Sequence, residues 1–250
     1  LIRFLNRLIT PTAGSIRWEG RDVLSFGPRQ LREHRRRIGM IFQEFYLIDR
    51  LSVLSNVLVG RFGAMPWPKA LLGRFSPEDL RLAHQALERV GLAAFAHRRV
   101  STLSGGQRQR VAIARALVQQ PRMILGDEPV SNLDPATSET ILSLLEAINR
   151  EDGITLIINL HSVELARRYA RRIIGMAEGR IVFDGGPEAL TPQVLAQIYG
   201  SYDGQPAEFT LERGAGHRGP GVLPASGGIL PPPAGNHRSD VRDLPPAALG

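Results

Sequence analysis

Two adjacent acidic residues, Asp127 and Glu128, follow a short apolar stretch in RMILGDEP, Arg122 to Pro129. The stretch is too short for a helix and is typical of a buried parallel strand, which delivers side chains to the edge where such sheets bind ligands. One carboxylate at this edge suits a magnesium ion, and the second can orient or deprotonate an attacking water. The pair therefore predicts a magnesium site with an acid that activates water, and two acids on a solvated loop are the alternative.

A second candidate site is LSGGQ, Leu103 to Gln107, which leads directly into the helical pattern QRQRVAIARAL. Ser104 can cap that helix, and Gly105 and Gly106 leave its first backbone N–H groups open at the positive end of the helix dipole. A helix end of this kind binds phosphate. An ordinary Ser-Gly-Gly loop is the alternative, but the helix that follows makes the phosphate site the more specific interpretation.

Three further polar residues stand at the ends of expected elements. Gln43 ends the apolar strand pattern IGMIFQ, and His161 ends GITLIINLH. Asp134, in SNLD, is the expected N-cap of a helix whose first residue is Pro135. A lone histidine at a strand end is more often structural than catalytic, so Gln43 and His161 gain meaning only together with the other motifs.

The elements that must position these residues alternate along the chain. Apolar spacing predicts a helix over residues 1–8 and a strand pair in SIRWEGRDV, and MPWPK, Met65 to Lys69, is expected to be a proline-broken loop. Buried strands are expected at RMILGD and GITLIINLH, followed by helices that begin near Pro135 and Ser162 and by a strand, turn and strand in IIGMAEGRIVFDG. The pattern predicts an α/β fold, a mostly parallel sheet covered by helices on both faces, with an N-terminal β part and a helical subdomain inserted at about residues 45–117. Residues 201–250 lack periodicity and are expected to form a disordered Pro/Gly-rich tail, after a single domain over residues 1–200.

Composition bounds the class of protein. The 250 residues are 43% hydrophobic and 22% charged, contain no cysteine, and carry a net charge of +7. No apolar run approaches the roughly 20 residues that span a bilayer. The positive charge is almost entirely arginine, so clusters such as Arg35 to Arg37 are interpreted as solvated faces, and no nucleic-acid partner is expected.

Taken in order, these motifs resemble those of the ATP-binding cassette (ABC) ATPases. The strand ending in Gln43 is similar to the Q-loop, LSGGQ to the signature motif, MILGDEP to Walker B and SNLD to the D-loop, and His161 to the switch histidine. The resemblance implies a P-loop NTPase-type fold with ATP and Mg²⁺ as cofactors. It also implies these roles. Glu128 is the general base, and His161 is a second catalytic residue at the γ-phosphate. Asp127 contacts magnesium, and Gln43 contacts both magnesium and ATP. The ATP of the opposite subunit is bound by Ser104, Gly105, Gly106 and Gln107, and Asp134 is an ATP-binding residue at the dimer interface.

Within that family, residues 1–200 are similar to the ATP-binding subunit of bacterial phosphonate importers. This implies a homodimer that sandwiches two ATP molecules, transmembrane permease subunits, and an external phosphonate-binding protein. It implies a peripheral position on the cytoplasmic face of the inner membrane. Two alternatives stay open: a soluble ABC ATPase of DNA repair or translation, and a non-catalytic ABC remnant that only occupies a permease.

One family motif is absent from the sequence. The phosphate-binding P-loop, GxxxxGK[ST], requires a lysine, and the only lysine is Lys69, with no glycine-rich loop before it. In the family, residues like LIRFLNRLITPTAGSI come directly after the P-loop, so the resemblance implies that this chain starts just past that loop. We therefore expect these 250 residues alone to bind ATP feebly and not to hydrolyse it.

Overall fold

The computed structural model describes residues 1–200, except for the side chains of Trp67 and Leu71. The expected tail, residues 201–250, lies outside the described residues. Among the helices of residues 1–200, none is long and apolar enough to cross a membrane.

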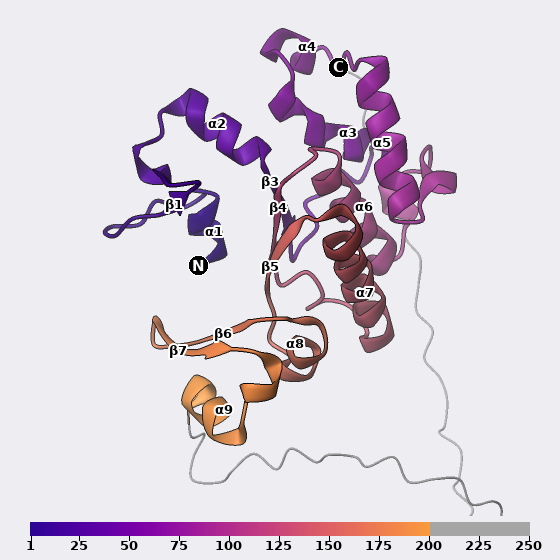
Figure 1. Cartoon of the computed structure of the whole chain (residues 1–250). Coiled ribbons are helices and arrows are strands. Elements are labelled where there is room, and N and C mark those ends of the chain that lie inside the picture. The colour runs from indigo at the N-terminus through magenta and orange to yellow at the C-terminus, as the bar shows by residue number, and fades with distance from the viewer. Residues whose placement is uncertain (201–250) are drawn as a thin grey trace, which may run out of the picture. The chain divides into compact units, whose positions relative to one another are not determined.

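The N-terminal part contains short elements, as Figure 1 shows. They are α1 (Ile2–Leu5), β1 (Arg17–Trp18), β2 (Arg21–Asp22), the 3₁₀ turn η1 (Val23–Ser25) and α2 (Pro28–Arg36). The strand pair is confirmed, since β1 and β2 are antiparallel. The helix predicted over residues 1–8 is shorter than expected, because Arg7 takes the left-handed conformation (φ 48°) and ends it.

The central sheet has three parallel strands in the order β3 (Ile38–Phe42), β4 (Met123–Asp127) and β5 (Thr155–Asn159). The register pairs Phe42 with Asp127 and Asp127 with Asn159. All three strands therefore end at the same level, and the residues that follow them emerge together along one edge of the sheet (Figure 1).

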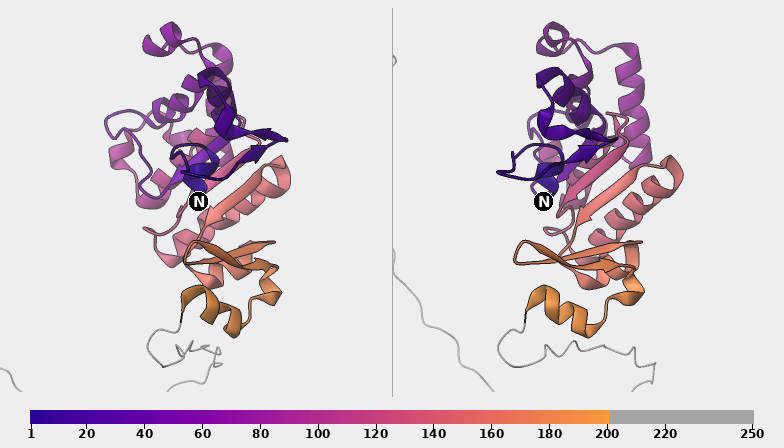
Figure 2. Two further views of the ribbon diagram at one scale, coloured as in Figure 1. Left: turned by 90° about the vertical axis from the view of Figure 1, so that its left-hand side faces the viewer. Right: turned by 60° about the vertical axis from the view of Figure 1, so that its left-hand side comes forward.

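Alternate side chains of the sheet face two different layers. Ile41 and Ile124 join the large core formed with α6 (Gly105–Leu117) and α7 (Pro135–Asp152). Met40 and Leu125 point to the other face and pack in a smaller cluster with Ile2 of α1. The two views of Figure 2 show α7 along one side of the sheet and the N-terminal elements on the other. The predicted α/β class is confirmed.

Strand β5 differs from the prediction of a fully buried strand. Its residues alternate between exposed and half-buried, and Ile157 is 37% exposed. Within residues 1–200, β5 pairs with β4 alone and forms an edge of the sheet. The apolar run GITLIINL predicts burial on both faces, but burial of both faces also needs other segments to cover the strand, and the sequence of the strand does not encode them.

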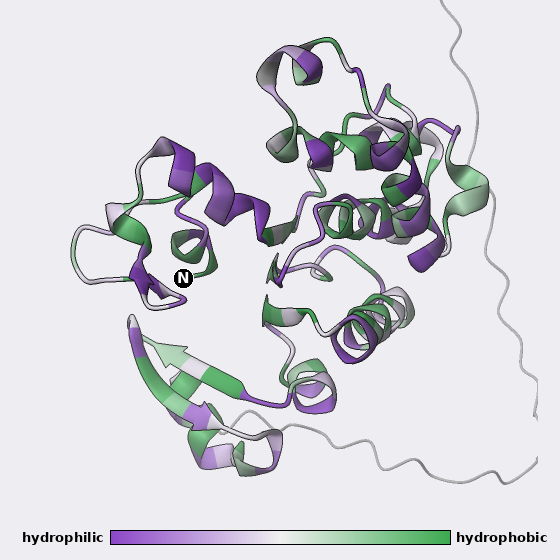
Figure 3. Ribbon diagram, turned by 45° about the horizontal axis from the view of Figure 1, so that its top comes forward, coloured by the Kyte–Doolittle hydropathy of each residue, from purple (hydrophilic) through white to green (hydrophobic). Residues whose placement is uncertain are grey.

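Between β3 and β4 the chain is helical. Its elements are α3 (Val53–Leu58), η2 (Val59–Ala64), α4 (Trp67–Leu71), α5 (Pro77–Arg89), η3 (Ala93–Phe95), η4 (Val100–Thr102) and α6. The prediction of a loop at MPWPK is wrong: α4 begins at Trp67, and Pro68 lies in its first turn, where the missing N–H has no helical partner to lose. Figure 3 shows hydrophobic stretches along these helices, and buried residues of α3, α5 and α6 share the large core.

Three contacts hold this helical region together. Arg61 of η2 contacts Asp79 of α5 at 2.7 Å and donates to the carbonyl of Val118 at 3.2 Å. Gly60 brings η2 against α6, because a Cβ at this position would lie 2.3 Å from the carbonyl oxygen of Arg115.

The C-terminal part follows β5. It contains α8 (Val163–Tyr169), β6 (Ile173–Ala177), β7 (Arg180–Gly185), η5 (Pro187–Ala189) and α9 (Pro192–Tyr199). The predicted strand, turn and strand is confirmed as an antiparallel pair, with Glu178 and Gly179 both at positive φ in the turn. Helix α9 packs closely on this pair, since a Cβ on Gly175 would lie 2.4 Å from Cδ1 of Ile198.

Candidate functional site

Four of the predicted site residues meet at the carboxyl edge of the parallel sheet. Gln43 directly follows β3, Asp127 ends β4, Glu128 follows it, and His161 comes two residues after the end of β5. Because the register aligns the ends of the three strands, residues far apart in sequence share one edge. Ligand sites of open parallel sheets lie at this edge.

Each acid of the pair has a cationic or ionisable partner. Oδ2 of Asp127 lies 2.9 Å from Nε of Arg3, and Oε1 of Glu128 lies 2.6 Å from Nε2 of His161. The two carboxylates are largely covered, with side-chain exposures of 18% and 22%. Arg3 was not among the predicted site residues, and its sequence position, 124 residues before Asp127, carries no signal of the contact.

Glu128 also has an unusual backbone. Its φ is 53°, a left-handed conformation that non-glycine residues rarely adopt and that is costly by about 1–3 kcal/mol. The turn is fixed from behind by Gln109 of α6, which is fully buried and donates from Nε2 to the carbonyl of Pro129 at 2.5 Å. The strained residue is therefore held in place by the helix that begins at LSGGQ.

The chemistry of Asp127 fits a divalent cation. Its carboxylate already accepts a cationic group, the Arg3 guanidinium, and it lies at a partly covered sheet edge. Within residues 1–200, no three His, Cys, Asp or Glu side chains gather closely enough to hold a metal alone. Magnesium matches such a site, since it uses one or two carboxylates, several waters and substrate phosphates.

The LSGGQ segment forms the N-terminus of α6 as predicted. Ser104 is the N-cap: its hydroxyl accepts from the amide of Gln107 at 3.3 Å, while Oε1 of Gln107 accepts from the amide of Ser104 at 3.0 Å. This reciprocal capping box uses the side chains of both residues. The backbone amides of Ser104 and Gln107 are therefore already hydrogen-bonded, and only the other N–H groups at the start of the helix remain open to an anion.

The two glycines of the segment have different surroundings. A Cβ on Gly105 would lie 3.3 Å from Cδ2 of Leu133, a contact that is tight but tolerable. A Cβ on Gly106 would lie 2.5 Å from Cγ2 of Thr137, closer than carbon atoms approach. Packing between α6 and α7 therefore requires glycine at Gly106, a reason additional to an open phosphate site.

Asp134 lies beside this segment and caps α7. Its Oδ1 accepts from the amide of Thr137 at 2.9 Å. Hydrogen bonds from Thr137, its side chain first and its amide second, hold the pKa of the Asp134 carboxyl below its usual value. The predicted N-cap is confirmed, and Asp134 adjoins Gly106 through the same residue, Thr137.

The segment after Gln43 is strained and anchored to α6. Phe45 and Tyr46 both have positive φ, 55° and 45°. Arg115 donates to both carbonyls, to that of Phe45 at 2.6 Å and to that of Tyr46. The helix that carries LSGGQ at its start thus holds the Gln43 segment near its end.

Comparison with known proteins agrees with this geometry. The family model described as ABC transporter matches residues 1–131. A protein from Bradyrhizobium diazoefficiens, named "Phosphonates import ATP-binding protein PhnC", is 51% identical over 199 residues, 80% of this chain and 74% of that protein. A protein of the same name from Nitratidesulfovibrio vulgaris is 52% identical over 201 residues, 80% of this chain and 76% of that protein.

A solved structure with the same fold is the dimeric, post-hydrolysis state of the ATP-binding cassette MJ0796, bound to ADP and Pi. The TM-score is 0.61 at 34% identity, and the match covers 74% of this chain and 78% of that chain.

Proposed function

The chain belongs to the ABC transporter family, and we propose from this premise that it forms the ATP-hydrolysing subunit of an importer of phosphonates. The observation that carries the proposal is the meeting of Gln43, Asp127, Glu128 and His161 at one sheet edge. The names of the relatives at about 50% identity support the substrate class.

We assign the chemistry of hydrolysis to the acid pair. Glu128 is the general base: its carboxylate accepts a proton from the attacking water and orients its lone pair. Nε2 of His161 lies 2.6 Å from Oε1 of Glu128, so the histidine holds the rotamer of Glu128 and lies at the same edge of the sheet. The left-handed backbone of Glu128, held through Pro129, turns the chain away from the direction of β4. This keeps the carboxylate at the edge of the sheet.

Asp127 and Gln43 are the proposed magnesium contacts, one through a carboxylate and one through an amide oxygen. Magnesium, when bound, neutralises charge on the phosphate oxygens. Arg3 contacts the same Asp127 carboxylate, so its guanidinium must either move away or keep one carboxylate oxygen when magnesium binds.

Gly105 and Gly106 present backbone N–H groups at the start of α6, which the capping box of Ser104 and Gln107 holds in place, with Asp134 beside them. We propose that they serve the nucleotide of a second subunit, since ABC cassettes dimerise. Transmembrane permease subunits and an external phosphonate-binding protein complete the proposed assembly, which places the chain peripherally on the cytoplasmic face of the inner membrane.

These 250 residues contain no GxxxxGK[ST] loop. Micromolar binding of ATP requires about 8 kcal/mol, and each charge-assisted hydrogen bond contributes about 1.5–3 kcal/mol. Several such donors and a lysine supply most of that total in P-loop proteins. We therefore propose that these 250 residues alone bind ATP feebly and do not hydrolyse it, and that hydrolysis requires them to be joined to a P-loop.

Growth on a phosphonate tests the proposal. A bacterium carrying the intact gene is deleted for the reading frame and supplied with methylphosphonate as the sole phosphorus source. We expect the deletion strain to stop growing, the wild-type frame to restore growth, and Glu128→Gln to fail. If the deletion strain grows at the wild-type rate on methylphosphonate and fails to grow only when another solute must be imported, phosphonate import is not the function.

A further inference from the structure

Among residues 1–200, Gln109 is the polar residue with the lowest exposure, 0%. It lies near the start of α6, and its Nε2 donates to the carbonyl of Pro129 at 2.5 Å. A carbonyl oxygen only accepts hydrogen bonds, so the nitrogen of the amide must face it and the oxygen must not. The orientation of this buried amide is therefore set by one carbonyl, that of the residue after the proposed general base.

Stability alone does not account for an amide at this position. Oε1 of Gln109 is buried and has no hydrogen-bond partner within the described residues. A methionine has a similar length and would remove that unpaired oxygen, but it would leave the buried Pro129 carbonyl without its donor. Either side chain leaves one buried acceptor unpaired, so the two chains should be about equally stable. The hydrogen bond therefore serves the position of Pro129.

The carbonyl that Gln109 holds belongs to the turn that carries the general base. Glu128 has a φ of 53°, whereas a residue directly before a proline prefers the extended region. The turn contains a hydrogen bond of its own, from the hydroxyl of Ser131 to the carbonyl of Glu128 at 3.1 Å. That bond moves with the turn and does not fix it relative to the sheet. The bond from Gln109 does, because it comes from another element.

A second buried side chain holds the residues that follow. Ser138 of α7 is 4% exposed, and its hydroxyl lies 3.3 and 3.4 Å from the carbonyl oxygens of Val130 and Leu133. In the described part of the chain, no side chain besides Gln109 donates to the Pro129 carbonyl. Helix α6 thus supports the beginning of this segment, where the general base lies, and α7 supports its end.

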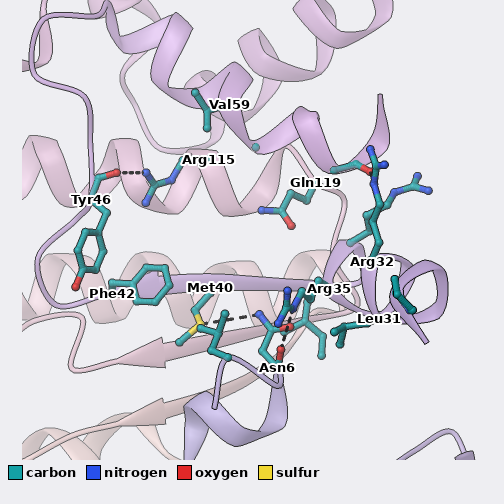
Figure 4. Close-up of a pocket in the computed structure, with 16 residues that line it drawn as sticks. Asn6, Leu31, Arg32, Arg35, Met40, Phe42, Tyr46, Val59, Arg115 and Gln119 are labelled. Carbon is teal, nitrogen blue, oxygen red and sulfur yellow. Dashed lines mark hydrogen bonds between the residues drawn. The ribbon is translucent and has the colours of Figure 1, made fainter. Parts of the chain in front are cut away.

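Helix α6 is fixed at both ends, so a side chain on it can define a position. The capping box of Ser104 and Gln107 holds its start. Near its end, Arg115 donates to the carbonyl of Phe45 at 2.6 Å and to that of Tyr46, the second of which Figure 4 draws as a dashed line. A loss at Gln109 should therefore loosen the turn and leave the helix in place.

We propose that Gln109 is a positioning residue for hydrolysis: its hydrogen bond to Pro129 holds the left-handed backbone of Glu128, and so keeps the carboxylate beside His161. The proposal rests on the proposed function, in which Glu128 is the general base. Because Gln109 is fully buried, it acts only through Glu128. A misplacement of about 1 Å can slow a reaction about 100-fold. Loss of this hydrogen bond should thus slow hydrolysis and spare ATP binding.

Kinetics distinguish positioning from a merely structural role, in a chain that also carries a P-loop. Gln109→Met should lower kcat by about 10–100-fold and leave the affinity for ATP, measured by filter binding, unchanged. In the Glu128→Gln background the same change should cause no further loss, because the two residues act as one unit. A wild-type kcat in Gln109→Met, or a parallel loss of ATP affinity, overturns the proposal. A wild-type chain that binds ATP without hydrolysing it contradicts the proposed function instead.

Hydrogen exchange on the 250-residue chain tests the support itself, without ATP. Gln109→Met removes the donor, and Gln85→Met makes the same change on the exposed face of α5. We expect the amides of residues 128, 130 and 131 to exchange at least about tenfold faster in Gln109→Met only, at an unchanged melting temperature. Gln109→Asn, whose amide is one methylene too short for the carbonyl, should also speed this exchange. Unchanged exchange in both Gln109 variants, or a large fall in the melting temperature of Gln109→Met, overturns the proposal.

Discussion

Nε2 of His161 lies 2.6 Å from Oε1 of Glu128 at the carboxyl edge of the parallel sheet. The two residues come from neighbouring strands, one just after β4 and one just after β5, and the aligned register brings them together. His161 is 71% exposed at its side chain and Glu128 22%. The carboxylate of Glu128 is thus mostly covered, while the histidine in contact with it is open to solvent.

In a chain that also carries a P-loop, Glu128→Gln should abolish hydrolysis and spare ATP binding. The amide keeps the size of the side chain but cannot take a proton from water, and such loss lowers kcat by about 10²–10⁴-fold. Phosphate release and filter binding measure the two steps. Glu146→Gln, on the exposed face of α7, is the matched control and should hydrolyse ATP normally.

His161→Ala should slow hydrolysis, and its effect should not add to that of Glu128→Gln. Two residues in contact that act as one unit give a double variant no slower than the worse single variant. The four rates of the double-mutant cycle measure this. Additive losses in log kcat would mean that His161 acts independently of Glu128.

Gly106→Ala should destabilise the chain through packing. Its Cβ would meet Cγ2 of Thr137 at 2.5 Å, and overpacking is unfavourable by about 1–3 kcal/mol, more than the gain of up to about 1 kcal/mol in helix propensity. Thr137→Ser removes that methyl group and keeps a hydroxyl beside Asp134. Thermal melting should therefore show the double variant Gly106→Ala/Thr137→Ser to be more stable than Gly106→Ala. A Gly106→Ala chain as stable as the wild type would leave the phosphate site as the only reason for the glycine.

Much of this site could be predicted from the sequence, because each motif is local. The strand before Asp127, the cap at Ser104 and the helix start at Asp134 depend on neighbours within a few residues. The contacts of Arg3 with Asp127 and of Arg115 with the Tyr46 carbonyl join residues 124 and 69 positions apart, and no periodicity encodes them. The exposed face of β5 was missed for the same reason, since cover depends on distant segments.

Arg61→Ala should destabilise the helical region and leave Asp79 uncompensated. The pair is largely buried, with side-chain exposures of 14% and 9%, and breaking such a pair is unfavourable by about 3–5 kcal/mol. Denaturant unfolding measures the change. Arg81→Ala, which breaks the exposed pair with Glu78, should leave the unfolding midpoint unchanged.

At acid pH, the chain should lose the contribution of the Asp79 carboxylate to its free energy of unfolding. Burial raises the pKa of its carboxyl, but hydrogen bonds from Arg61 and Ser76 outweigh burial and hold the pKa below its usual value. A carboxyl with a depressed folded pKa stabilises fully above its unfolded pKa, about 4, and loses that contribution as pH falls through the folded value. Unfolding free energies of wild type and Asp79→Asn should thus converge as the pH falls below about 4. A difference that is constant from neutral to acid pH would show that the charge contributes nothing.

ATP-driven uptake of methylphosphonate by a reconstituted transporter tests the central claim most directly. The chain, joined to a P-loop, is assembled with the proposed permease in liposomes that enclose ATP, with the external binding protein and labelled methylphosphonate outside. We predict ATP-dependent accumulation of methylphosphonate with the wild-type subunit and none with Glu128→Gln. Accumulation that persists with Glu128→Gln, or an assembly that hydrolyses ATP without moving any phosphonate, would contradict the account.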